Sequence, residues 1–310
     1  MSLIEQAAKR LEQLRQAGVE LPDESVMSPV ATPAPEPLPT RPLADIPLPP
    51  SSPQQPAGLS PSNTHITLNL EAMSASGLLT PDAARSQLAD EYRVVKRPLI
   101  ANAMGRGTTP VQNGNLIMVT SAMPGEGKSF SAINLAISIA MELDNTVMLV
   151  DADVARPSVL NMLGLPPARG LLDVLQQNSV DISSVLLRTN IEKLSILPSG
   201  TPHPRATELL ASDTMIRLLD DMASRYNDRI IVFDSPPLLL TTEARVLATH
   251  MGQVIIVVNA ENTVQSAVKQ AISTIESCPL KMMLLNQVRA SKSEGYGYGY
   301  GYGYGYGHEK

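Results

Sequence analysis

The chain has 310 residues, of which 43% are hydrophobic and 17% charged, so it can bury the core of one or two domains. Its formal net charge is −6 and it has no long run of Lys or Arg, which argues against nucleic-acid binding. The single cysteine, Cys278, excludes an internal disulfide framework and a cysteine-based zinc site, and four scattered histidines do not suggest a metal cluster. No apolar run approaches the roughly 20 residues of a membrane span, and the polar N-terminus does not resemble a signal peptide. We therefore expect a cytoplasmic protein without direct membrane insertion.

The two ends of the chain differ in composition from its centre. Within residues 1–18, apolar residues at helical spacing predict an amphipathic helix over 3–16, which is either a frayed terminus or a docking helix for a partner. Residues 19–63 hold 13 of the 26 prolines, which predicts a disordered linker, acting as a spacer or as a proline-rich ligand. Residues 293–310 contain a Gly-Tyr repeat, which predicts a flexible tail. The remaining residues, 64–292, have the size of one α/β domain.

Predicted strands and helices alternate along this central region. Alternating apolar residues predict a short strand near residues 66–70, and Thr80 followed by Pro81 predicts the start of a helix that runs to Lys96. Further strands are predicted over 116–120, 146–150, 194–197, 230–233, 254–258 and 282–285, with helices over 129–143, 207–225 and 263–277. Strands buried on both faces by helices predict an α/β fold with a doubly wound, mainly parallel sheet.

The segment 121–129 reads Ser-Ala-Met-Pro-Gly-Glu-Gly-Lys-Ser and lies between a predicted strand and a predicted helix. This is the sequence and context of a phosphate-binding P-loop, in which glycines let backbone N–H groups surround phosphate oxygens. Lys128 is expected to reach the β- and γ-phosphates, and the Ser129 hydroxyl to bind Mg²⁺. Ala122 stands where the pattern has its first glycine, a position at which another small residue is often tolerated.

Acidic residues follow two of the predicted strands. Asp151 and Asp153 come directly after residues 147–150, and Asp234 comes directly after 230–233. Ligands of open parallel sheets bind beyond the carboxyl ends of the strands, so these carboxylates are expected near the phosphates. They can hold Mg²⁺, and one of them can accept a proton from an incoming hydroxyl. The set predicts phosphoryl transfer and leaves the acceptor open between water, a small molecule and a protein hydroxyl.

The loop, the two acidic strand ends and the terminal tyrosines together resemble the bacterial tyrosine autokinases, P-loop kinases unrelated in fold to eukaryotic protein kinases. The segment 151–158 and the Gly-Tyr tail are similar to the exosortase-associated branch of that family, which is tied to exopolysaccharide gene clusters. The resemblance covers roughly Thr64 to the C-terminus. It implies an ATP:protein-tyrosine phosphotransferase that regulates exopolysaccharide synthesis, polymerisation or export. The phosphoacceptors that it implies are Tyr296, Tyr298, Tyr300, Tyr302, Tyr304 and Tyr306.

The resemblance also implies roles for individual residues of the site. The expected catalytic residues are Lys128, Asp151, Asp153 and Asp234. The expected Mg²⁺ ligands are Ser129, Asp151 and Asp234. The expected ATP-binding residues are Ala122, Met123, Pro124, Gly125, Glu126, Gly127, Lys128, Ser129, Phe130 and Asn286. The proton acceptor is either Asp153 or Asp151, and Asn286 resembles the family's contact with the base.

The same resemblance implies partners. Asp90, Arg93 and Lys96 are spaced like the Glu-x-x-Arg-x-x-Arg helix of the family's ring assembly, with Asp and Lys as departures, so a ring-like homo-oligomer is expected. A further departure is Ala155, which stands where many members have arginine; here Arg156 follows one place later. The family generally needs a membrane-embedded chain-length-determinant activator. The activator is expected to be a separate chain that recruits the kinase to the inner face of the plasma membrane.

Two other functions compete with this interpretation. The deviant-Walker ATPases of partition and division sites share the fold and both acidic strand ends, but their signature lysine would fall at Met123. A regulatory scaffold of a polysaccharide assembly complex would bind ATP as a switch and phosphorylate little. Partner binding that does not depend on Lys128 would favour the scaffold.

Overall fold

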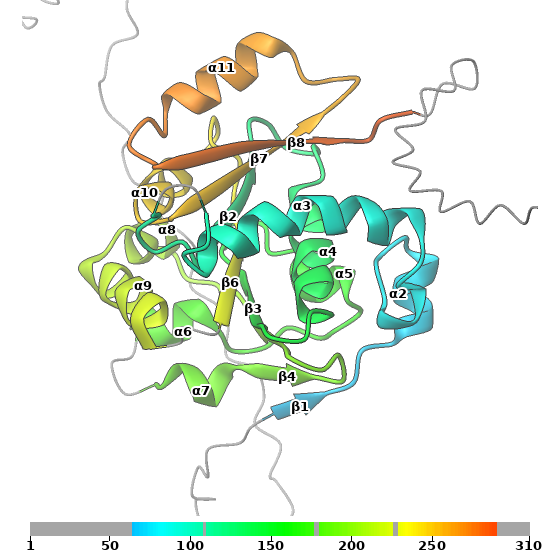
Figure 1. The fold of residues 1–310 in the computed structure, drawn as a ribbon. Helices are drawn as coiled ribbons and strands as arrows, with labels where there is room; N and C mark the ends of the chain where they lie inside the picture. Colours follow the sequence, from blue (N-terminus) through cyan, green and yellow to red (C-terminus); the bar gives the residue numbers. More distant parts are fainter. Residues whose placement is uncertain (1–63, 108–109, 177–179, 226–228, 290–310) are drawn as a thin grey trace, which may run out of the picture. The chain divides into compact units, whose positions relative to one another are not determined.

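The computed structural model describes residues 64–107, 110–176, 180–225 and 229–289 (Figure 1). The predicted N-terminal helix, the linker 19–63 and the Gly-Tyr tail 293–310 lie outside these residues. All the described residues belong to a single compact unit of the chain. In this described part, none of the helices combines the length and the apolar character that crossing a membrane requires.

One sheet contains all the described strands. They are β1 (Thr64–Ile66), β2 (Leu116–Ser121), β3 (Thr146–Asp151), β4 (Leu187–Thr189), β5 (Leu194–Leu197), β6 (Arg229–Asp234), β7 (Gln253–Asn259) and β8 (Leu280–Asn286). Their order across the sheet is β1-β4-β5-β3-β6-β2-β7-β8, and every neighbouring pair is parallel except β4 and β5. This arrangement confirms the predicted mainly parallel α/β fold.

Helices cover both faces of the sheet (Figure 1). They are α2 (Leu70–Ala75), α3 (Gln87–Ala103), α4 (Lys128–Ala140), α5 (Val159–Met162), α6 (Leu171–Gln176), α7 (Ile182–Val185), α8 (Ala206–Leu210), α9 (Asp213–Arg225), α10 (Thr242–Thr249) and α11 (Gln265–Ser273). One hydrophobic core lies between the sheet and the helices α2 through α5, and a second core lies between the other face of the sheet and the helices α6 through α11.

The central strand β2 shows why the sheet is doubly covered. Leu116 and Met118 contribute to the core beneath α6 to α11, whereas Ile117 and Val119 contribute to the core beneath α3 and α4. Successive side chains of a strand point to opposite faces, so a continuous apolar run must be buried on both. All six residues of β2 are buried, so the P-loop that follows is anchored to a strand that is shielded from solvent along its whole length.

The prediction of one helix over 81–96, with Thr80 as its N-cap, is wrong at both ends. Pro81 begins only a short 3₁₀ turn (Pro81–Ala83), and α3 begins at Gln87, where the Ser86 hydroxyl accepts the N–H of Ala89 (3.2 Å). The helix also continues past Pro98 to Ala103. Pro98 is exposed, so the carbonyl that its missing N–H leaves free can bond to water, and the helix tolerates it.

Two more predicted elements end early because polar side chains cap the backbone. The strand predicted over 66–70 ends at Ile66, since the Asn69 side chain accepts the N–H of Ala72 (3.0 Å) and so starts α2. The helix predicted over 207–225 is divided into α8 and α9. Ser212 causes this division because its hydroxyl donates to the carbonyl of Leu209 (2.7 Å) and accepts the N–H of Met215 (3.3 Å).

Candidate active site

The P-loop follows β2 directly and leads into α4. Gly125 has a φ of 81° and Gly127 a φ of 90°, a region that residues with a side chain rarely adopt. Gly127 is also the N-cap of α4, which begins at Lys128. The loop therefore places the positive end of a 13-residue helix beside its own backbone N–H groups, an arrangement suited to a phosphate.

A cleft of about 650 Å³ opens beside this loop. Its walls include Lys128 and Ser129 of α4, Asp153 and Arg156 after β3, and Pro237 and Leu240 after β6. The structure thus brings most of the predicted loop residues and one of the predicted acidic residues, Asp153, to the same hollow. The volume is within the range of small-molecule sites.

Lys128 forms an ion pair across the cleft. Its Nζ donates to Oδ2 of Asp153 at 2.7 Å, and the two side chains are only 13% and 5% exposed. Oδ1 of Asp153 accepts the backbone N–H of Arg156 at 3.1 Å. Both oxygens of Asp153 are therefore occupied, and the lysine charge is held at the place where a phosphate would lie.

Asp151 and Asp234 lie side by side beneath the cleft. They are paired in the register of β3 and β6, and both are almost completely buried. Oδ2 of Asp151 accepts the N–H of Val159 (3.1 Å), but its Oδ1 and both oxygens of Asp234 have no hydrogen-bond partner within the described part of the chain. Buried carboxylate oxygens without a partner are rare and need a positive charge or a proton.

The electrostatics of these two carboxyl groups reflect that deficit. Burial, together with the nearby charge of Asp234, raises the pKa of Asp151 to about 7. Burial raises the pKa of Asp234 to about 6, partly offset by the charge of Lys128. The site therefore holds more negative charge than its own cations neutralise.

This donor set fits Mg²⁺. The ion prefers oxygen ligands and is usually held by one or two carboxylates together with water and phosphate oxygens. Among the described residues, no group of three His, Cys, Asp or Glu side chains is placed to hold a metal ion. Ser129 adds a hydroxyl at the start of α4, and the Ser158 hydroxyl donates to it at 2.8 Å. Ser158 was not expected from the sequence, because one serine in a loop carries no pattern.

Asn286 lies on the other side of the loop. Its Nδ2 donates to the carbonyl of Glu126 at 3.0 Å, and Nε2 of Gln287 donates to the carbonyl of Gly125 at 3.3 Å. A smaller hollow of about 400 Å³ lies on this side, lined by Met123 to Glu126 and by residues after β7. Of the predicted loop residues, Ala122 is fully buried and lines neither hollow.

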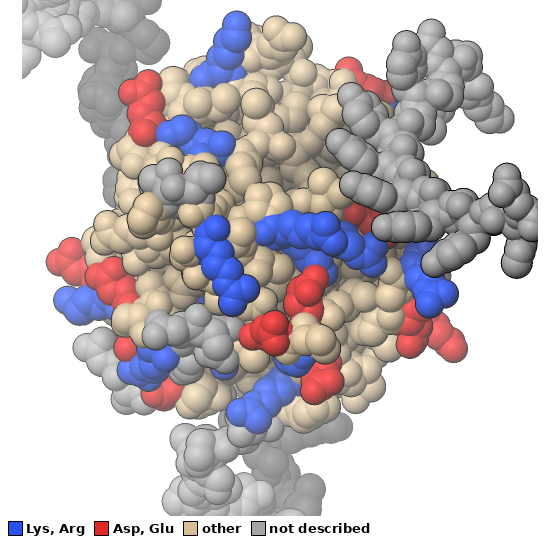
Figure 2. All heavy atoms as spheres, viewed as in Figure 1, with Lys and Arg blue, Asp and Glu red and all other residues tan. Residues whose placement is uncertain are grey.

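The predicted assembly residues of α3 lie apart from the cleft. Asp90 is exposed and Arg93 half-buried, and the two form an ion pair with each other. Lys96 is 5% exposed, and its Nζ donates to the carbonyl of Ser138 (2.5 Å) and pairs with Glu142 (2.7 Å). Figure 2 shows basic and acidic side chains interspersed on the face that carries α3.

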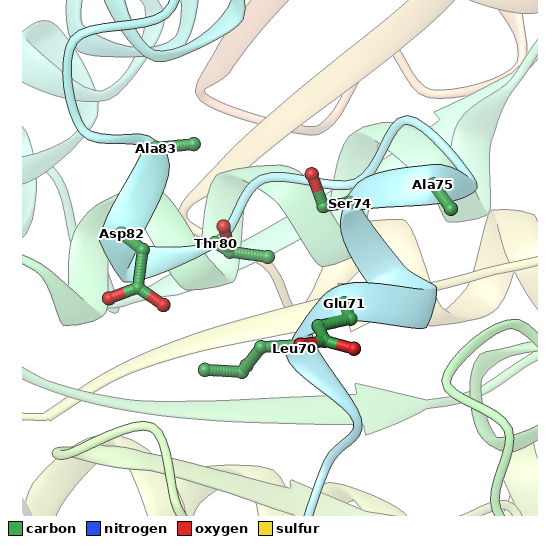
Figure 3. Close-up of a pocket in the computed structure, with 7 residues that line it drawn as sticks. All are labelled: Leu70, Glu71, Ser74, Ala75, Thr80, Asp82 and Ala83. Carbon is green, nitrogen blue, oxygen red and sulfur yellow. The ribbon is translucent and has the colours of Figure 1, made fainter.

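A further hollow, of about 580 Å³, lies between α2 and the 3₁₀ turn (Figure 3). Its two carboxylates are Glu71 and Asp82, and its apolar wall includes Leu70. None of the residues predicted to bind nucleotide lines it, so we do not connect it with phosphoryl transfer.

Comparison with known proteins identifies relatives of the chain. Residues 114–287 match the family model described as "AAA domain". The chain is 30% identical to tyrosine-protein kinase YwqD of Bacillus subtilis over 210 residues. The aligned region covers 67% of this chain and 84% of that protein. It spans only about a fifth (21%) of some longer relatives.

Solved structures agree with these relatives. The chimerical protein CapA2B2 superposes with a TM-score of 0.59 at 28% identity, over 74% of this chain and 94% of that one. The kinase domain of Escherichia coli tyrosine kinase ETK superposes with a TM-score of 0.54 at 28% identity, over 62% of this chain and 74% of that one. With the P-loop and both acidic strand ends gathered at one edge of the sheet, these similarities establish that the chain belongs to the bacterial P-loop tyrosine-protein kinases.

Proposed function

We propose that the chain is an ATP-dependent autokinase that phosphorylates the tyrosines between residues 296 and 306. The observation that carries the proposal is the Lys128–Asp153 ion pair, which puts a phosphate-binding cation in contact with a proton acceptor inside one cleft. The tail supplies the acceptor hydroxyls, each flanked by glycines that allow it to enter a cleft.

In the proposed mechanism the chain first binds the triphosphate. The N–H groups of Glu126 and Gly127 and the N-terminus of α4 surround the phosphate oxygens. Lys128 then exchanges its contact with Asp153 for the β- and γ-phosphates. This exchange is favourable because the mostly buried lysine gains a more highly charged partner.

Asp151, Asp234 and Ser129 would hold Mg²⁺. When bound, Mg²⁺ neutralises charge on the phosphates and on the leaving group. The support for this assignment is the pair of buried carboxyl groups with three oxygens that lack a partner among the described residues.

We assign proton transfer to Asp153. Unlike Asp151 and Asp234, this carboxylate lines the cleft, and the departure of Lys128 frees its Oδ2. The tyrosine oxygen attacks the γ-phosphorus, the bond from that phosphorus to the oxygen of ADP breaks, and the phenolic proton passes to Asp153. Autophosphorylation is thereby coupled to nucleotide binding, because the base is neutralised until the phosphates attract Lys128.

The wider role that we propose follows the family resemblance. The kinase would regulate exopolysaccharide synthesis, polymerisation or export, act in the cytoplasm, and be recruited to the inner face of the plasma membrane by a separate membrane-embedded activator. It would assemble with copies of itself through Asp90 and Arg93 of α3. Lys96, which is buried against α4, would support that helix from within the subunit.

The intact mass of the purified protein after incubation with ATP and Mg²⁺ tests this function. We expect stepwise gains of one phosphate, mapped to the tail, which Lys128→Met and truncation after Ser293 both abolish. Lys269→Met is the matched control, because Lys269 is exposed on α11 away from the cleft, and it should leave the mass steps unchanged. Hydrolysis of ATP without any gain of mass, with and without a membrane activator, would instead support the ATPase-switch or scaffold function.

A further inference from the structure

The end of β8 is bonded to the back of the P-loop. Asn286 and Gln287 donate to two consecutive loop carbonyls, those of Glu126 (3.0 Å) and Gly125 (3.3 Å). The two amides lie about 160 positions from these carbonyls in the sequence. They meet because β8 lies only one strand, β7, away from β2, whose end leads into the loop. Neither contact follows from the P-loop pattern.

These two bonds determine where the loop N–H groups point. The described part of the chain has no cis peptide bonds, and in a trans peptide the C=O and the N–H point in opposite directions. A carbonyl of Gly125 turned toward Gln287 therefore turns the N–H of Glu126 toward the cleft side. In the same way, the carbonyl of Glu126 turned toward Asn286 turns the N–H of Gly127 toward the cleft side. In the described part of the chain, neither N–H has a hydrogen-bond acceptor, so both are available to an anion.

The Glu126 side chain completes the closure of the back of the loop. Its carboxylate accepts the N–H of Met123 at 2.8 Å and contacts the hydroxyl of Thr263, and the residue is only 3% exposed. It lines the smaller hollow and not the cleft. The loop thus keeps its acidic group and two of its carbonyls on one side, and leaves free N–H groups on the other.

Gly127 shows how close the contact is. A Cβ at this position would lie 2.1 Å from Nδ2 of Asn286, well inside van der Waals contact. Gln287 is held in turn, because Nδ2 of Asn259 at the end of β7 donates to its Oε1. Asn259 and Asn286 are register partners in β7 and β8, so the sheet itself fixes the spacing of the two amides.

We propose that Asn286 and Gln287 are positioning residues that hold the loop N–H groups ready for a polyphosphate. Asn286 then acts on the phosphates through the loop and makes no contact with the base. This inference rests on the nucleotide site of the proposed function, and it concerns binding, so it can be tested without the kinase reaction.

The test compares a ligand that has a base with one that has none. The affinities of the full chain for ATP, GTP and inorganic tripolyphosphate, each with Mg²⁺, are measured by calorimetry for the wild type, Asn286→Ala and Gln287→Ala. We expect Asn286→Ala to lower the affinity for all three ligands by the same factor of about ten, which is the effect of one lost hydrogen bond. Gln287→Ala should weaken them by about threefold, because its bond is longer and exposed. Gln270→Ala, which removes an exposed amide on α11, is the matched control and should change none of them.

Each other outcome has a definite meaning. If Asn286→Ala weakened ATP but not tripolyphosphate, or changed the ratio of ATP to GTP affinity, Asn286 would be a base contact and the proposal would be wrong. Unchanged affinities for all three ligands would also overturn it. A fall in the melting temperature of ligand-free Asn286→Ala would show general destabilisation. In that case the affinities of Gln287→Ala for the same three ligands decide. The wild-type protein could bind tripolyphosphate but gain no phosphate on incubation with ATP and Mg²⁺, with and without a membrane activator. That result would refute the proposed function and leave this inference standing.

Discussion

Asp151 and Asp234 illustrate at the scale of single residues how a functional site can oppose stability. Both carboxyl groups have a raised pKa, about 7 and about 6, mainly because they are buried; the charge of Asp234 adds to the effect on Asp151. A group with a raised pKa binds its proton more tightly in the folded than in the unfolded chain. Their contribution to stability is therefore complete below the unfolded pKa of about 4 and is lost as the pH rises through 6 to 7.

The first prediction follows from this sign. Without Mg²⁺ and nucleotide, Asp234→Asn should raise the free energy of unfolding at pH 8 by about 2 kcal/mol, because it removes one of two buried like charges. The gain should be smaller at pH 5, where both carboxyl groups already carry protons. Urea unfolding in the presence of a chelator at both pH values measures it. The matched control is Asp144→Asn, at an exposed position, which should change little; equal stability of wild type and Asp234→Asn at pH 8 would contradict the explanation.

At this scale the sequence predicts residues better than it predicts contacts. The acidic residues could be located because they follow predicted strands, and the carboxyl ends of parallel strands meet at one edge. The contact of Lys128 with Asp153, and that of Asn286 with Glu126, join elements that only the folded sheet brings together. Asn286 was singled out from the sequence, but for its resemblance to a base contact, whereas the structure places its amide on the loop backbone.

At the scale of elements, α3 and α4 are joined by a buried lysine. Lys96 donates to the carbonyl of Ser138 in the last turn of α4, where helix carbonyls lack partners of their own, and pairs with Glu142 just beyond it. A cation at this end also interacts favourably with the helix dipole. Lys96 therefore acts as a capping side chain supplied by another helix.

The second prediction tests that role. Lys96→Met should lower the free energy of unfolding by about 1–3 kcal/mol, because it leaves a buried carbonyl without its donor. Urea unfolding at low protein concentration measures the loss. Arg97→Met, on the exposed side of the same helix, is the control. If Lys96→Met changed the oligomeric state and not the stability, Lys96 would be an interface residue instead.

The strands were easier to predict from sequence than the helix boundaries. Long apolar runs such as β2, β3 and β6 are buried on both faces, so their composition alone marks them. The three residues of β4 are too few to show a pattern. Helix boundaries depend on single hydrogen bonds, such as the one from the Ala89 N–H to Ser86, and these compete with other capping signals like Thr80-Pro81.

At the scale of the whole molecule, the charge of the chain leads to a third prediction, which depends on the proposed function. Each phosphate adds about −1.5 to −2 charges, so six would add roughly −9 to −12. The protein starts at −6. Full phosphorylation should therefore expel the tail from the acidic cleft and loosen a homo-oligomer that tail-to-neighbour contacts hold together.

Native mass spectrometry before and after incubation with ATP and Mg²⁺ measures this change. A variant with all six tail tyrosines replaced by phenylalanine, treated in the same way, controls for nucleotide binding and should keep its oligomeric state. The same oligomer at zero and full phosphorylation would show that the tail charge does not control assembly.

The strand order has a consequence for how such assemblies are connected. β1 and β8 are the two edges of the sheet, and seven inter-strand steps of about 4.8 Å put roughly 34 Å between them (Figure 1). The segment that precedes Thr64 and the segment that follows Arg289 are thus attached at opposite sides of the kinase domain. A partner bound to the first segment and a neighbouring subunit receiving the second have separate points of attachment. Under the proposed function, a subunit tethered to the membrane through its N-terminal segment can therefore pass its tail to another subunit without releasing the tether.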